Sequence, residues 1–184
     1  MAEQTFIAFL RAVNVGGRTV AMARLRELFA ELGLAGVRTY IQTGNVFFRA
    51  DAAVDRAALT RRIEAHLATA LGFQVPTMLR TVDEVAALVE ADPFHGIEVT
   101  DDVRLCVVFL SEPLPADFAL PHLTPKGDLE VIAATPGEAF VVAHRIGGRP
   151  TGNAADAFGR AYRGQGTARF FHTTVKILAA ARKG

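Results

Sequence analysis

Residues 6–18 read FIAFLRAVNVGGR, and this stretch decides how the rest of the chain is arranged. Residues 6–13 carry apolar side chains on both alternating faces, with Arg11 as the single charge, which is typical of a strand covered on both sides of a sheet. Asn14, Gly16 and Gly17 then favour a turn whose backbone N–H groups can converge on an anion before a helix begins. The stretch therefore predicts a central strand that runs into a candidate anion-binding turn.

The residues up to position 80 continue in a recognisable order. Apolar residues at helical spacing predict a helix over 21–32, and two β-type runs at 37–42 and 46–49 flank a compact turn, which predicts a hairpin. A second helix opens at Asp55 and stops at Gly72, and a strand follows over 73–79. This is the βαββαβ order of the ferredoxin-like fold. Pro76 agrees with it, because proline belongs on an edge strand and the fourth strand of that fold is an edge.

The remainder predicts a second, smaller α+β half with antiparallel strands. A capping-box pattern opens a bridging helix over 81–90, and an apolar strand follows over 103–110. The proline-spaced stretch 113–125 is expected to hold one short helix or turn. A hairpin over 128–134 and 139–144 and helices near 153–162 and 173–183 complete the chain. We expect two subdomains, residues 1–94 and 95–184.

The amino-acid composition limits which kinds of binding site and cellular location can be expected. The 184 residues are 51% hydrophobic, so a sizeable core is expected, and 20 basic against 19 acidic residues leave a net charge of +1, so any basic site must be local. One cysteine excludes an intramolecular disulfide and fits a reducing compartment. The start lacks the pattern of a signal peptide and no apolar run is long enough to cross a bilayer, so we expect a cytoplasmic protein without a membrane partner.

Common catalytic and metal-binding patterns are missing from the sequence. The five histidines have no metal-ligand spacing, so no metal site and no cofactor are predicted. Cys106 lies in an apolar run, where burial raises the pKa of a thiol, and it is expected in the core rather than at a reactive centre. A nucleophile-elbow motif is also missing, and we assign no catalytic residue.

Three blocks resemble the signature of a bacterial family known as domain of unknown function 1697. They are FLRAVNVGG at 9–17, VRTYIQTGNV at 37–46, and TAR at 167–169 with Thr173 and Lys176. Ala12 and Thr43 depart mildly from the family pattern, and Phe170 and Phe171 replace its asparagine and tryptophan. The resemblance implies a two-part fold with a ferredoxin-like N-terminal portion, and it brings no established activity.

Polar residues near the ends of the first three strands make up the candidate site. Arg11, Asn14, Gln42 and Asn45 with the Gly16 and Gly17 amides would form a fork of donors suited to phosphate or carboxylate. Arg169, Thr173 and Lys176 would share one face if they are helical, with Thr173 as a helix cap, and would add two cations to the pocket. The alternatives are an internal carboxylate for Arg11, a plain turn for the glycines and a solvated face for the last helix. The predicted ligand-binding residues are Arg11, Asn14, Gly16, Gly17, Gln42, Asn45, Arg169, Thr173 and Lys176.

The preferred hypothesis is a protein that binds a small anionic ligand, phosphorylated or nucleotide-like, in a cleft between its halves. The donors include no general base, which favours binding or electrostatic catalysis over nucleophilic chemistry and leaves open whether the protein is an enzyme. One alternative is an RNA-binding module that stacks bases on Phe47 and Phe48, although the near-zero net charge disfavours a nucleic-acid partner. Another is a non-catalytic interaction domain that pairs through the Pro76 edge. The oligomeric state is left open.

Overall fold

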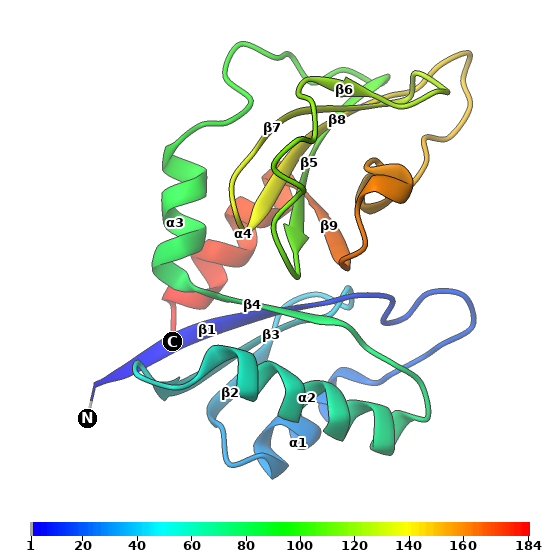
Figure 1. Ribbon diagram of the computed structural model, residues 1–184. Coiled ribbons are helices and arrows are strands. Elements are labelled where there is room, and N and C mark those ends of the chain that lie inside the picture. The colour runs from blue at the N-terminus through cyan, green and yellow to red at the C-terminus, as the bar shows by residue number, and fades with distance from the viewer. Residues whose placement is uncertain (1) are drawn as a thin grey trace. The chain divides into compact units, whose positions relative to one another are not determined.

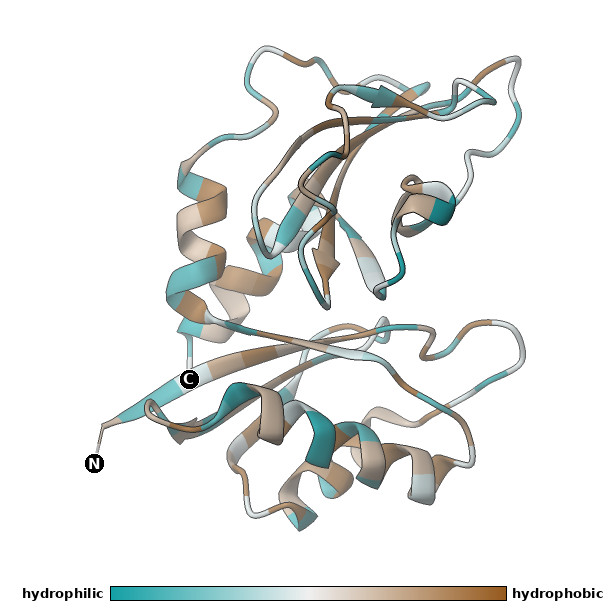
Figure 2. Ribbon diagram, in the orientation of Figure 1, coloured by the Kyte–Doolittle hydropathy of each residue, from teal (hydrophilic) through white to brown (hydrophobic). Residues whose placement is uncertain are grey.

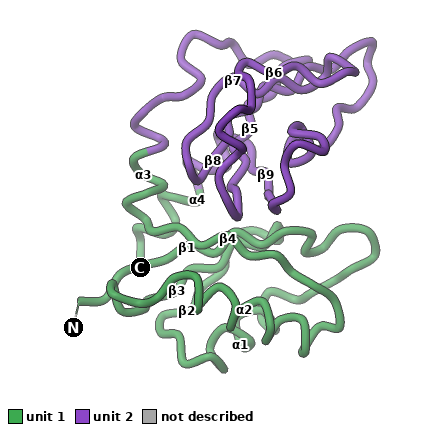
Figure 3. Tube along the Cα trace, viewed as in Figure 1, with its two compact units in different colours: residues 1–87, 177–184 green, residues 88–176 purple. Residues whose placement is uncertain are grey.

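The computed structural model describes residues 2–184, and the chain divides into two compact units (Figure 3). Unit 1 contains the residues up to Ala87 together with Ile177–Gly184, and unit 2 contains Leu88–Lys176. Residues 95–184, expected as one subdomain, are divided between the two units, because Ile177–Gly184 belong to unit 1. Within residues 2–184 the chain has two antiparallel sheets and four α-helices, so the α+β prediction is confirmed.

Unit 1 has the predicted ferredoxin-like order (Figure 1). Its sheet has the antiparallel order β2-β3-β1-β4, so β1 is central and β4, which directly follows Pro76, is an edge strand as expected. The elements are β1 (Glu3–Leu10), α1 (Met22–Glu31), β2 (Ala35–Thr39), β3 (Asn45–Asp51), α2 (Arg56–Leu71), β4 (Thr77–Thr81) and α3 (Val82–Glu90), the last of which continues into unit 2.

One face of this sheet packs on α1 and α2. Alternate residues of β1 point toward these helices, and the Phe6 ring stacks on the Phe48 ring of β3 with centroids 5.6 Å apart. Phe29 of α1 contacts Phe48 from the helix side. Figure 2 shows β1 changing from hydrophilic at its start to hydrophobic along the rest of its length. Burying a phenylalanine or leucine in such a core stabilises the fold by roughly 1.5–3 kcal/mol.

The local signals for helix ends in unit 1 are confirmed. Asp55 caps α2 by accepting a hydrogen bond from Ala58 N at 3.1 Å, and Gly72 ends that helix in the left-handed region with φ +80°. Thr81 and Glu84 form the reciprocal bonds of a capping box at the start of α3, at 3.1 and 3.0 Å. The fourth strand begins only at Thr77, later than predicted, because Pro76 cannot donate to the ladder.

Unit 2 is built on a five-stranded antiparallel sheet of order β6-β7-β8-β5-β9. Its strands are β5 (Val103–Leu110), β6 (His122–Leu123), β7 (Leu129–Ala134), β8 (Glu138–His144) and β9 (Gly166–Phe170), followed by α4 (Phe171–Arg182), which ends in unit 1. Cys106 of β5 is buried as expected, and burial raises the pKa of its thiol to about 11.

Unit 2 differs from the sequence-based expectations in three places. The stretch 113–125 contains the expected turn, where Phe118 N donates to Pro115 O at 3.0 Å, and it also holds the short strand β6, which was not expected. Residues 153–162 form two single 3₁₀ turns, Ala154–Asp156 and Gly159–Ala161, instead of a continuous helix, since Gly159 at φ +61° breaks the helical path. Strand β9 was not predicted, because its glycine and alanine lack the branched side chains that mark strands.

None of the helices within residues 2–184 is both long and apolar enough to span a lipid bilayer.

Candidate functional site

Three connections of unit 1 meet at one end of its sheet (Figure 1). Antiparallel pairing places the end of β1 beside the starts of β3 and β4, where Leu10 N donates to Gly44 O and Arg11 N donates to Pro76 O, both at 2.9 Å. We call the three segments 11–21, 40–44 and 72–76 the loop cluster. The cluster and the start of β3 bring together Arg11, Asn14, Gly16, Gly17, Gln42 and Asn45, the six site residues predicted in the N-terminal half.

Asn14 joins the first two segments of the loop cluster. Its side-chain Nδ2 donates to Gln42 O at 2.9 Å, and its Oδ1 accepts a hydrogen bond from Val20 N at 2.7 Å. The residue lies at φ +60°, a conformation that asparagine tolerates better than most residues. The Asn14 Nδ2 therefore holds the turn after β1 against the hairpin turn, whereas its Oδ1 makes a hydrogen bond within segment 11–21.

Asn45 shapes the hairpin turn from inside. It is fully buried, and its Nδ2 donates to Tyr40 O and to Thr43 Oγ1, each at 3.0 Å. The Tyr40 N–H in turn donates to Asn45 O at 3.1 Å. The sequence analysis placed Asn45 among the ligand donors, but its side chain is inaccessible and its amide hydrogens are directed at the turn. We therefore assign it the role of holding the turn in place.

The loop cluster stores backbone strain. Ala12, Asn14 and Ile41 adopt positive φ angles of 62°, 60° and 51° without being glycine. Such a conformation is a genuine outlier for a β-branched residue such as Ile41, and it costs on the order of 1–3 kcal/mol. Strain of this kind persists only where surrounding contacts enforce it, and it is concentrated at binding and active sites.

Residues 15–18 form an exposed turn at the tip of the cluster. Gly16 and Gly17 lie at φ +59° and +83°, and Arg18 N donates to Val15 O at 3.0 Å, which is the pattern of a type I′ turn. Within residues 2–184 the N–H groups of Gly16 and Gly17 have no acceptor. Arg18 directly follows these two glycines in the sequence, and its guanidinium lies 4.7 Å from the centre of the Phe73 ring.

The chemistry of the loop cluster suits an anion. Segments 11–21 and 40–44 contain Arg11 and Arg18 but no aspartate or glutamate. Gln42 is exposed, and its side-chain amide has no partner in the described part of the chain. Arg11 is half-buried directly after β1. Sequence reasoning missed Arg18 as a donor, although its position immediately after the glycine pair is a usable signal.

The three predicted site residues of the C-terminal half lie in unit 2, and their joining with the loop cluster stays a prediction. Arg169 lies on β9 and not on a helix, so the expected helical face shared with Thr173 and Lys176 is wrong. Arg169 is 7% exposed, and its guanidinium donates to Thr167 Oγ1 at 2.7 Å and to Ala168 O at 2.9 Å. Burial lowers its pKa to about 10. Thr173 does not cap α4, because that helix already begins at Phe171.

The aromatic platform expected for the RNA-binding alternative is missing from β3. Phe48 packs in the core beneath the helices, and Phe47 is 1% exposed and lies 5.1 Å from the Arg38 guanidinium. Neither ring offers a face on which a base can stack, so the observation that suggested RNA binding does not support it.

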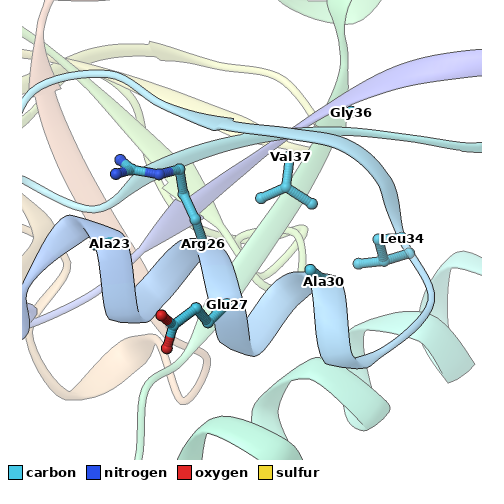
Figure 4. A pocket seen from close by; sticks show the side chains of 7 residues that line it. All are labelled: Ala23, Arg26, Glu27, Ala30, Leu34, Gly36 and Val37. Carbon is cyan, nitrogen blue, oxygen red and sulfur yellow. The ribbon is translucent and has the colours of Figure 1, made fainter.

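A separate hollow of about 530 Å³ lies between α1 and β2 (Figure 4). Figure 4 shows the Val37 side chain pointing toward the helix and the Arg26 side chain running toward the strand. Arg26 Nη1 already donates to Thr39 Oγ1 at 2.7 Å, and its neighbour Glu27 carries the opposite charge. The hollow therefore lacks the convergent donors found at the loop cluster.

No group of three or more His, Cys, Asp or Glu side chains able to hold a metal ion occurs among the described residues.

Comparisons with known proteins agree with the fold. The family model described as "Protein of unknown function (DUF1697)" matches residues 4–140. The structure of the conserved bacterial protein SP0830 from Streptococcus pneumoniae is similar, with a TM-score of 0.72 and 22% sequence identity over 98% of this chain and 99% of that one. At this identity the likeness shows the fold alone. A comparison with curated proteins gives no match.

Proposed function

Because the chain belongs to the DUF1697 family of proteins of unknown function, we propose a function from its own geometry: the loop cluster of unit 1 binds a small anionic ligand, phosphorylated or nucleotide-like. The observation that carries this proposal is the exposed turn 15–18, whose two glycine N–H groups have no acceptor within residues 2–184 and lie beside Arg18. Paired backbone donors next to a guanidinium suit an oxyanion.

The residues of the cluster take two roles in the proposal. Gly16, Gly17, Gln42 and the arginines Arg11 and Arg18 are the donors to the anion. Asn14 and Asn45 position them, because their amides hold the loops that carry the donors. Arg169, Thr173 and Lys176 are kept as additional predicted donors, and the proposed site does not depend on them. We propose a cytoplasmic location, with the single buried cysteine as support.

Binding to a fixed, preorganised set of donors requires little rearrangement on the protein's side. The strained conformation of Ile41 and the bonds made by Asn14 and Asn45 support such preorganisation. The donors include no group placed as a general base, so we propose that the loop cluster binds its ligand without a chemical step.

The test is calorimetric titration of the full chain with inorganic phosphate and with a nucleoside monophosphate at constant ionic strength. Saturable binding is expected, and Arg18→Ala or Gln42→Ala should weaken it, by roughly tenfold or more for the arginine, because a charge-assisted hydrogen bond contributes about 1.5–3 kcal/mol. Arg163→Ala is the matched control, since it removes an exposed arginine from unit 2. Absence of saturable binding by the wild type, or equal affinity in the Arg18 variant and the control, would overturn the proposal.

A further inference from the structure

Unit 2 contains a near copy of the turn at the tip of the loop cluster. Residues 146–149 read Ile-Gly-Gly-Arg, where residues 15–18 read Val-Gly-Gly-Arg. Gly147 and Gly148 lie at φ +59° and +72°, and Arg149 N donates to Ile146 O at 3.1 Å, so both strings form the same type I′ turn. Both turns are also exposed at their first residue, by 56% at Val15 and 51% at Ile146.

The second turn is held at both ends. Arg145 N donates to Asp102 O at 2.7 Å, and Gly152 N donates to the Asp128 carboxylate at 2.8 Å. Figure 1 shows the segment between these points as a gold loop that projects from the end of β8. The turn is therefore presented from a fixed base, and an incoming ligand need not order it.

The donors of the second turn are available. In the part of the chain that the structure describes, the N–H groups of Gly147 and Gly148 have no acceptor, and the guanidinium groups of Arg145 and Arg149 have no partner. Both arginines are exposed, and residues 145–153 contain no acidic side chain. Two arginines thus flank a pair of open backbone donors, the same combination that segment 11–18 offers.

We propose that residues 145–149 form a second anion site, which takes a phosphate group or a similar oxyanion independently of the loop cluster. This inference goes beyond the proposed function, because it extends the same chemistry to a second turn that does not depend on the loop cluster. Asp128 is the opposing charge: its carboxylate accepts bonds from Gly152 N and Thr124 Oγ1. Its negative charge near the base of the loop should make the second site weaker than the first.

The experiment follows the backbone amide signals of the four glycines by NMR while the full chain is titrated with inorganic phosphate at constant ionic strength. In the wild type, the signals of Gly147 and Gly148 should shift saturably, as should those of Gly16 and Gly17. The double variant Arg145→Ala/Arg149→Ala should abolish the shifts of Gly147 and Gly148 and leave those of Gly16 and Gly17 unchanged. Arg18→Ala should weaken only the shifts of Gly16 and Gly17.

The two proposals fail in different ways. If Gly147 and Gly148 do not respond while Gly16 and Gly17 do, the second site is wrong and the proposed function stands. If only Gly147 and Gly148 respond, the second site stands and the loop cluster loses its assigned function. Shifts of Gly147 and Gly148 that persist in the double variant with unchanged midpoint would also overturn the second site, because the flanking cations would then contribute nothing.

Discussion

Gly44 and Gly17 have nearly the same φ angle, +87° and +83°, in different surroundings. A Cβ atom on Gly44 would lie 3.0 Å from Leu10 Cβ, whereas one on Gly17 would meet nothing within 4 Å. Gly17→Ala should therefore lower the free energy of unfolding by about 1–2 kcal/mol through backbone strain alone. Gly44→Ala should lower the free energy of unfolding by roughly a further 1–3 kcal/mol, because the added methyl group overpacks the core. Urea denaturation of both variants measures the difference, and equal losses would contradict the close approach at Gly44.

At the same scale, the sequence predicted that several polar residues come together but not which hydrogen bonds they make. It placed Asn14, Gln42 and Asn45 near strand ends, and the pairing of β1 with β3 brings those ends together. It could not tell that the Asn14 and Asn45 amides bond to loop carbonyls, because those carbonyls are positioned only by long-range folding. The positive φ angle of Ile41 could not be predicted from the sequence either, since β-branched residues disfavour this conformation.

At the scale of elements, α2 is coupled to β4 through Glu64, whose Oε2 accepts a hydrogen bond from Thr77 N at 3.1 Å. Burial raises the pKa of this carboxyl group, an effect that the bond from Thr77 partly offsets. The folded state therefore binds the proton more tightly than the unfolded state, and the wild type gains stability as pH falls through the raised pKa. Glu64→Gln keeps an acceptor and removes the charge, so it should stabilise the protein at neutral pH, by less than about 1 kcal/mol because the group is partly solvated.

The pH profile of that variant is the check. The stability difference between Glu64→Gln and the wild type should be present at neutral pH and vanish at acid pH, where both side chains are uncharged. Glu64→Ala serves as the control, because it loses the acceptor for Thr77 N and should destabilise the protein at both pH values. A difference that does not change with pH would contradict a raised pKa at Glu64.

The helices and strands whose own residues contain caps or strand-forming side chains were predicted from the sequence. The elements that lack such residues were missed. The caps at Asp55, Gly72 and Thr81 and the apolar residues of β1 led to the ferredoxin-like unit, and separate sequence blocks led to the family resemblance. Both predictions are confirmed. Strand β9 was missed because Gly166 and Ala168 carry no strand signal, and it is a strand only by pairing with β5.

At the scale of the whole molecule, Arg38 of β2 connects distant parts of the sequence within unit 1. Its Nη1 and Nη2 donate to Ala180 O and Ala181 O at 3.0 and 3.1 Å, at the end of α4. The C-terminal carbonyls of a helix carry partial negative charge, which the guanidinium neutralises. Arg38→Ala should lower the free energy of unfolding by about 1–3 kcal/mol and speed hydrogen exchange in the last turn of α4.

Arg26→Ala is the matched control for that variant, because within residues 2–184 Arg26 bonds only the exposed Thr39 hydroxyl. Arg26→Ala should lower the free energy of unfolding by no more than about 0.5 kcal/mol, and hydrogen exchange in α4 should not change. Comparable effects of the two substitutions would show that Arg38 does not hold the C-terminal turns. Sequence reasoning had no means to predict this contact, since nothing local to residue 38 points to residues 180 and 181.

The return of residues 177–184 to unit 1 has a consequence for biosynthesis. A ribosome releases β1 through β4 long before it releases these residues, because all of unit 2 is made in between. During that interval Arg38 has no helix end to bind, and the first sheet lacks its contact with the end of α4. Completion of unit 1 therefore follows the synthesis of unit 2, which ties the maturation of the first sheet to translation of residues 88–184.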